Sequence, residues 1–147
     1  IPKRDWSSDV CSSDLAGQLR LRGELGMVAA QSRDGIPADF LFRAGGDQTV
    51  RGYAYQSLGV REAGAIVGGR WLAVASAEYV RWLTPKWGAA LFVDAGDAAD
   101  QAGDLRPLLG YGLGARWKSP VGLLGLDLAR GEEADQTRLH FAVGFSF

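Results

Sequence analysis

Apolar and polar residues alternate along several segments of this chain, and this period of two constrains the fold more than any other feature. In residues 139–147 the odd positions are Leu, Phe, Val, Phe and Phe, whereas the even positions are His, Ala, Gly and Ser. Residues 19–29, 109–118 and 123–129 alternate in the same way, and residues 69–82 and 87–95 do so less regularly. Successive side chains of a strand point to opposite faces of a sheet, so the pattern predicts six β-strands.

The links between these strands favour one class of all-β fold. Short links at 83–86 and 119–122 alternate with longer ones at 31–67, 95–107 and 130–136. Transmembrane β-barrels have short turns at one end, longer loops at the other and aromatic girdles near strand ends. The aromatic residues that would suit such girdles are Trp71, Trp82, Trp87, Tyr111 and Trp117. The chain therefore reads as part of an antiparallel up-and-down barrel, since six strands are too few to close one. A soluble β-sandwich binding module is the alternative.

Composition narrows the partners and the chemistry. The 147 residues carry 16 Lys and Arg against 17 Asp and Glu with no basic run, which argues against a nucleic-acid partner. No window approaches the 18 apolar residues of a transmembrane helix. His140 is the only histidine, so neither a His-based metal cluster nor a catalytic triad can be assembled around a second one. We expect no enzyme activity, no bound metal and no cofactor.

The first fifteen residues differ from the rest. The stretch DWSSDVCSSDL (5–15) has no hydrophobic period, carries the only cysteine, Cys11, and looks like a translated sequencing-library adapter. We expect residues 1–15 to be non-native, to pack on nothing and to pair with no strand. The native domain would then be residues 16–147.

Five motifs of residues 16–147 resemble one family in order and spacing. They are FRAGGDQTVRGYAYQSLG (42–59), EYVRW (78–82), FVDAGDA (92–98), GLGARWKSPVG (112–122) and a last strand that ends at Phe147. The chain resembles the C-terminal barrel region of the BamA/TamA superfamily of outer-membrane assembly factors, and within it most resembles TamA.

The resemblance implies a sixteen-stranded barrel preceded by periplasmic POTRA domains, of which this chain holds the last six strands. It implies location in the bacterial outer membrane and a role in inserting or exporting β-barrel and autotransporter-type clients through a seam between the first and last strands. An inner-membrane-anchored TamB-like partner would bind through the absent POTRA domains. A two-partner secretion pore of the same superfamily is the alternative function.

The resemblance also assigns a role to the arginine at the centre of residues 42–59. In similar proteins this loop folds into the barrel lumen, and the arginine meets acidic side chains there. Strand parity makes Asp94 the first candidate partner and Glu78 the second. The motif residues are Gly45, Gly46, Val50, Arg51, Gly52 and Tyr53. Other polar residues expected to face the lumen are Arg20, Arg22, Glu24, Arg116, Lys118, Asp127 and His140, and the small residues of GYGLG (110–114) would make room for the loop.

The last strand, RLHFAVGFSF (138–147), is expected to be both one side of the seam and an insertion signal. A terminal aromatic residue is typical of the signal that directs barrels to the membrane. This sequence departs from that pattern, because Ala142 stands where the signal usually has glycine, and the glycine is at Gly144. The residues assigned to the signal are Leu139, Phe141, Val143, Gly144, Phe145 and Phe147.

Overall fold

A computed structural model describes residues 3–13 and 17–144 of the chain. The strands, in chain order, are β1 (Lys3–Ser13), β2 (Gly17–Val28), β3 (Val60–Glu62), β4 (Ala65–Val67), β5 (Trp71–Trp82), β6 (Trp87–Ala99), β7 (Leu108–Ser119), β8 (Gly122–Gly131) and β9 (Thr137–Gly144). Two short 3-10 helices, η1 (Ala38–Phe40) and η2 (Ala102–Asp104), lie in loops. The described part of the chain holds no helix that is long and apolar enough to cross a membrane.

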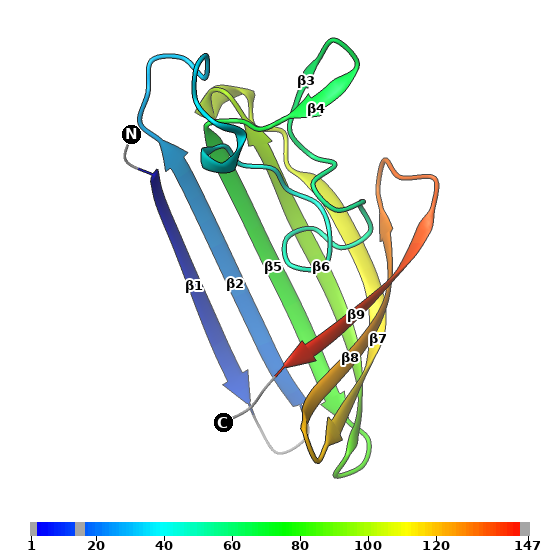
Figure 1. The fold of residues 1–147 in the computed structure, drawn as a ribbon. Coiled ribbons are helices and arrows are strands. Elements are labelled where there is room, and N and C mark those ends of the chain that lie inside the picture. Colours follow the sequence, from blue (N-terminus) through cyan, green and yellow to red (C-terminus); the bar gives the residue numbers. More distant parts are fainter. Residues whose placement is uncertain (1–2, 14–16, 145–147) are drawn as a thin grey trace.

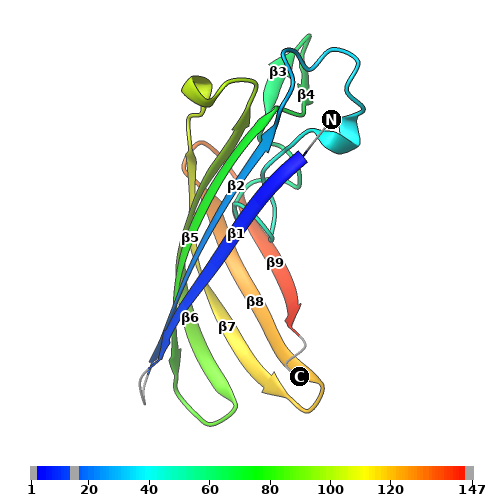
Figure 2. The same cartoon turned by 90° about the vertical axis from the view of Figure 1, so that its left-hand side faces the viewer.

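Seven strands form one antiparallel sheet in the order β1-β2-β5-β6-β7-β8-β9, and β3 and β4 form a separate hairpin. Figure 1 shows the long loops gathered at one end of the sheet and the short turns at the other. Figure 2 shows that the sheet is curved, with the segment between β2 and β3 inside the curve. The fold class predicted from the sequence is confirmed: six predicted strands belong to an antiparallel barrel sheet, which is not closed in this fragment.

The two faces of the sheet follow the predicted alternation. Large apolar side chains that are exposed on the outer face include Leu21, Leu91, Leu113, Leu126 and Phe141. The inward face, which carries the segment between β2 and β3, buries the intervening residues, among them Val74, Val80 and Phe92. No second sheet covers the apolar outer face within the described residues. The described strands form one curved sheet and not two stacked sheets, so the β-sandwich alternative is wrong.

A compact apolar core lies between the inward face and the segment between β2 and β3. Its buried members are Val28, Phe42, Ala44, Val50, Tyr53, Leu58, Leu72, Val74 and Ala98. Phe42, Ala44, Val50, Tyr53 and Leu58 come from residues 42–59, and the rest come from β2, β5 and β6. Residues 42–59, called the inserted loop below, are thus held by packing as well as by polar contacts.

The expectation that residues 1–15 pair with no strand is wrong for the part that the structure describes. Strand β1 pairs with β2 along its whole length, from Lys3 opposite Val28 to Ser13 opposite Gln18. The absence of a hydrophobic period did not prevent this, because the backbone groups on the free edge of β2 can bond to any extended segment. Residues 1–2 and 14–15 lie outside the described residues. That residues 1–15 are non-native stays a prediction from the sequence.

One further expectation needs correction. Trp82 does not belong to an outer aromatic girdle: it lies on the inward face of β5, and the ammonium of Lys118 sits 3.9 Å from the centroid of its ring. Trp87 and Trp117 do lie on the outer face, where their rings stack with centroids 5.5 Å apart. The link at 31–67 contains η1, β3 and β4, and the two three-residue strands are too short to show a period in the sequence.

Candidate functional site

The inserted loop is tied to the rim of the sheet and then turns sharply. Backbone bridges join Phe42 to Gly69 and Ala44 to Leu58. Gly45 and Gly46 follow with φ values of 105° and 107°, in the region that favours glycine because it has no Cβ. The hydroxyl of Thr49 accepts the N–H of Gly45 at 2.8 Å, which closes the turn. The next residues, Val50 and Arg51, are thereby directed onto the inward face.

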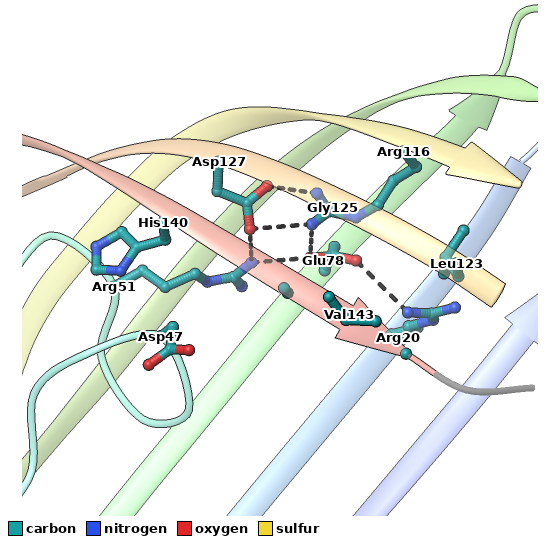
Figure 3. A pocket seen from close by; sticks show the side chains of 12 residues that line it. Arg20, Asp47, Arg51, Glu78, Arg116, Leu123, Gly125, Asp127, His140 and Val143 are labelled. Atoms are coloured by element: carbon teal, nitrogen blue, oxygen red, sulfur yellow. Dashed lines mark hydrogen bonds and ion pairs between the residues drawn. The ribbon is translucent and has the colours of Figure 1, made fainter. Parts of the chain in front are cut away.

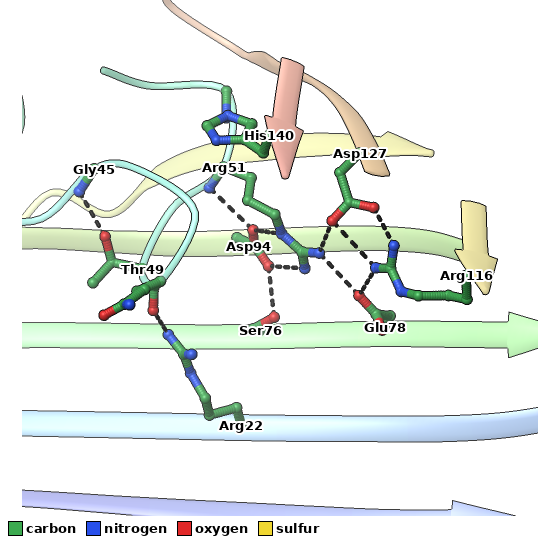
Figure 4. Close-up of polar contacts among 12 residues, drawn as sticks. Arg22, Gly45, Thr49, Arg51, Ser76, Glu78, Asp94, Arg116, Asp127 and His140 are labelled. Atoms are coloured by element: carbon green, nitrogen blue, oxygen red, sulfur yellow. Dashed lines mark hydrogen bonds and ion pairs between the residues drawn. The ribbon is translucent and has the colours of Figure 1, made fainter. Parts of the chain in front are cut away.

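Arg51 reaches three carboxylates on three different strands (Figure 4). Its Nε and Nη2 donate to the two oxygens of Asp94 at 2.7 and 2.9 Å, a bidentate pair. Its Nη1 donates to Glu78 Oε2 and to Asp127 Oδ2, each at 2.9 Å. The backbone N–H of Arg51 also donates to Asp94, at 3.1 Å. All the donor nitrogens of this guanidinium are engaged.

A second arginine completes the cluster. Arg116 of β7 donates from Nη2 to Glu78 Oε2 at 2.6 Å, and its Nη1 donates to Asp127 Oδ1. Glu78 Oε2 and Asp127 Oδ2 therefore each accept from both arginines. Figure 3 shows the two guanidiniums side by side with the carboxylates between them, and Arg20 at the edge. The set Arg51, Glu78, Asp94, Arg116 and Asp127 is called the charge cluster below.

The charge cluster is buried, and its carboxylates outnumber its guanidiniums. The five residues are all 9% exposed or less. Two guanidiniums face three carboxylates, and the nearest further cation, Arg20, is 3.8 Å from Glu78 Oε1 with a partly exposed side chain. Burial by itself would lower the pKa of Arg51, but the hydrogen bonds and charge of Asp94, followed by those of Glu78 and Asp127, outweigh it and raise the pKa. Arg51 thus stays charged at any pH that the protein meets.

The neighbours of the charge cluster orient it. Ser76 donates from its hydroxyl to Asp94 Oδ1 at 2.6 Å, so both oxygens of that carboxylate are held. The ring of Phe92 lies 3.5 Å from the central carbon of the Arg51 guanidinium, a cation–π contact. Room for the loop comes from glycine: a Cβ on Gly110 would overlap the carbonyl oxygen of Arg51, and one on Gly114 would overlap the Asp127 carboxylate.

The structure brings Asp94 and Glu78, the two candidate partners, to Arg51. Asp127 and Arg116 were expected only to face the lumen. The bond from Arg51 to Asp127, and the link from Arg116 to Arg51 through the shared carboxylates of Glu78 and Asp127, were missed. The sequence did contain a signal for this cluster, because its four strand residues lie at inward positions of the consecutive strands β5, β6, β7 and β8. They are Glu78, Asp94, Arg116 and Asp127.

Other expected inward residues also face the loop side. Arg22 donates to the carbonyl of Gln48, and Glu24 lines a pocket with loop residues. The N–H of Gly52 donates to His140 Nε2 at 3.2 Å. On β9, Leu139, Phe141 and Val143 are exposed on the outer face, and Gly144 is the last described residue. Phe145 and Phe147 lie outside the described residues. Within the described ranges, no three His, Cys, Asp or Glu residues gather where they could hold a metal ion.

Comparison with known proteins places this arrangement in a family. The model of the Omp85 superfamily domain matches residues 11–147. The outer membrane protein assembly factor BamA of Nitratidesulfovibrio vulgaris is 31% identical over 142 residues, which cover 87% of this chain and 18% of that protein. The crystal structure of BamA from Haemophilus ducreyi lacking POTRA domains 1–3 superposes with a TM-score of 0.72 at 21% identity, over 99% of this chain and 34% of that one. The chain, which spans only a part of these relatives, therefore belongs to the Omp85 superfamily.

Proposed function

We propose that this chain is the seam-forming part of an outer-membrane assembly factor, which helps β-barrel proteins to insert without enzymatic chemistry of its own. The protein lies in the bacterial outer membrane, with the lipid bilayer against its apolar outer face. The observation that supports the proposal most is membership of the Omp85 superfamily together with 31% identity to an outer membrane protein assembly factor.

In this proposal the barrel seam next to β9 opens and exposes a strand edge within the membrane. Lipid offers no hydrogen bonds, so unpaired backbone groups there cost several kcal/mol each, as an order of magnitude. An unfolded client that adds a strand to the edge satisfies both its own backbone groups and those of β9. The outer side chains of β9 are apolar and exposed, with Leu139 at 64% and Phe141 at 60%, which suits a strand that meets lipid and client together.

The finer assignments extend the same proposal. The motif of residues 42–59 supports a TamA-like branch with autotransporter-type clients. An inner-membrane-anchored TamB-like protein would then bind through POTRA domains that precede this chain. The charge cluster would hold the inserted loop in the lumen, with Arg51 bound by Asp94 and Glu78. A two-partner secretion pore would use the same barrel to export a polypeptide through the lumen instead.

Site-specific cross-linking of the full-length protein tests the proposal. Val143 on β9 and Val93 on β6 are the same residue type on the same face and are 47% and 45% exposed, but β6 is paired on both edges. In a Cys11→Ser background, Val143→Cys should trap a client that carries a cysteine in its last strand, whereas Val93→Cys should not. Equal trapping at both positions would contradict edge pairing. Export of a soluble polypeptide without client assembly would favour the secretion pore.

The proposed insertion signal is tested separately. Deleting Phe147 should reduce membrane insertion of the full-length protein, because it removes the terminal aromatic residue of the proposed signal. Phe145→Asp should also reduce insertion, because a charge on the lipid side of a strand costs about 2–4 kcal/mol near the midplane and less near the interface. The control is Gly103→Asp in the loop after β6, where a side chain meets open space. Heat-modifiable migration and protease resistance in outer membranes report insertion. Normal assembly of both changed proteins would rule out the signal.

A further inference from the structure

Besides the bond from Arg51 to Asp127, the inserted loop contacts three residues of the hairpin formed by β8 and β9. These contacts join segments about 80 residues apart in the sequence and are independent of the carboxylates of the charge cluster. They involve Gly52 and Tyr53 on the loop, and Gly131, Glu133 and His140 on the hairpin. Figure 4 shows His140 directly above the loop backbone beside Arg51.

Gly52 is pressed against the hairpin backbone. Its φ of 97° is in the region that favours glycine. A Cβ at this position would lie 2.5 Å from the carbonyl carbon of Arg130 and 2.5 Å from the nitrogen of Gly131. The loop and the hairpin therefore meet backbone to backbone, at a separation that only glycine permits.

Tyr53 extends this contact into the connection between β8 and β9. Its side chain is buried, at 6% exposed, and its ring covers Gly131, where a Cβ would lie 2.6 Å from the ring carbons. Its hydroxyl accepts the backbone N–H of Glu133 at 3.2 Å. The tyrosine thus fills the space above the glycine and binds the turn that follows it.

His140 provides the contact on β9 itself. Its side chain points inward, and its Nε2 accepts the N–H of Gly52 at 3.2 Å. An accepting imidazole nitrogen carries no proton, so this contact uses the neutral ring. Within the described residues, the backbone of β9 bonds only to β8. The loop is therefore the contact that holds β9 from the side opposite to its apolar face.

We propose that Gly52 and Tyr53, through His140 and Glu133, hold the β8–β9 hairpin in place, so that the inserted loop positions the seam strand. This inference rests on the proposed function for its purpose, since it makes the loop a restraint on the edge that clients would use. His140 and Tyr53 are positioning residues in this scheme. Because coupling between two sites is reciprocal, weakening the hairpin side must also loosen the loop.

Hydrogen–deuterium exchange of the full-length protein in lipid nanodiscs tests the restraint without any client. Each lost hydrogen bond contributes about 1 kcal/mol, so Tyr53→Phe and His140→Ala should each speed exchange of residues 137–144 about fivefold, and the double variant about 25-fold. Exchange at Gly52 and Tyr53 should rise as well in His140→Ala. Exchange in β5 and β6 should not change.

Two matched variants make the test specific. Tyr55→Phe removes the same hydroxyl from a neighbouring tyrosine that is 75% exposed, and it should leave β9 exchange unchanged. His140→Gln should restore protection, because its amide oxygen can occupy the position of Nε2. Unchanged β9 exchange in the double variant, or an equal rise in all strands, would overturn the proposal. A loss of client assembly that leaves these exchange rates unchanged would count against the restraint and not against the assembly function.

Discussion

The change Arg51→Ala should release the inserted loop from the lumen while the sheet persists. The variant loses the two bonds to Asp94 and the bonds to Glu78 and Asp127. Three buried carboxylates would then face one buried guanidinium, that of Arg116, with the partly exposed Arg20 at the edge of the cluster. Removing one partner from a buried ion pair costs about 3–5 kcal/mol, because the remaining charge is left without compensation. The population of the undocked loop should therefore rise by roughly two to three and a half orders of magnitude.

Amide exchange of residues 45–58 in the full-length protein measures this population. Arg22→Ala is the control, because it removes an arginine that donates to the carbonyl of Gln48 in the same loop. That single bond has an exposed environment, so its loss should cost less than about 1.5 kcal/mol. A double-mutant cycle of Arg51→Ala with Asp94→Ala should give a coupling energy of about 1–3 kcal/mol, since the two residues touch.

Two results would refute this reasoning. The first is loop exchange in Arg51→Ala that matches Arg22→Ala, which would mean that the apolar core of the loop holds it without the charge cluster. The second is additivity in the cycle with Asp94, which would mean that the bidentate pair contributes nothing beyond its separate members. A sheet that unfolds in Arg51→Ala would show instead that the loop is part of the fold and not a docked segment.

One further variant tests the space that the inward face of the sheet leaves for the inserted loop, and another tests whether the outer face meets lipid. Gly110→Ala should expel the inserted loop and speed its amide exchange, since a Cβ there overlaps the Arg51 carbonyl. Gly23→Ala, whose Cβ would meet nothing within 4 Å, should leave the amide exchange of the loop unchanged. Equal effects of the two variants would show that the loop adapts to the added methyl group. Leu126→Arg, on the outer face of β8 and 46% exposed in the protein alone, should destabilise the inserted barrel by about 2–4 kcal/mol in denaturant titrations, and no loss of stability would mean that this face does not meet lipid.

Strand positions and their faces could be predicted from the sequence because alternation is a local property of the chain. Each inward residue, including Asp94 and Glu78, is two positions from the next along its own strand, so parity alone orients it. The glycines of residues 110–114 could be assigned to the inward face in the same way. The prediction failed where no period exists, as in β1, whose pairing with β2 depends on backbone groups that all sequences share.

The composition of the charge cluster was decided by tertiary structure. Its members stand on four neighbouring strands and on the loop, and they meet only because the pairing register sets Phe92 opposite Glu78 and Gly112, and sets Gly114 opposite Asp127. A shift of one residue in any register would turn a carboxylate to the lipid side. The sequence by itself determined which residues could face inward. Register, sheet curvature and the depth to which the loop descends decided which inward residues bond to the same arginine. These three features depend on contacts between segments far apart in the chain.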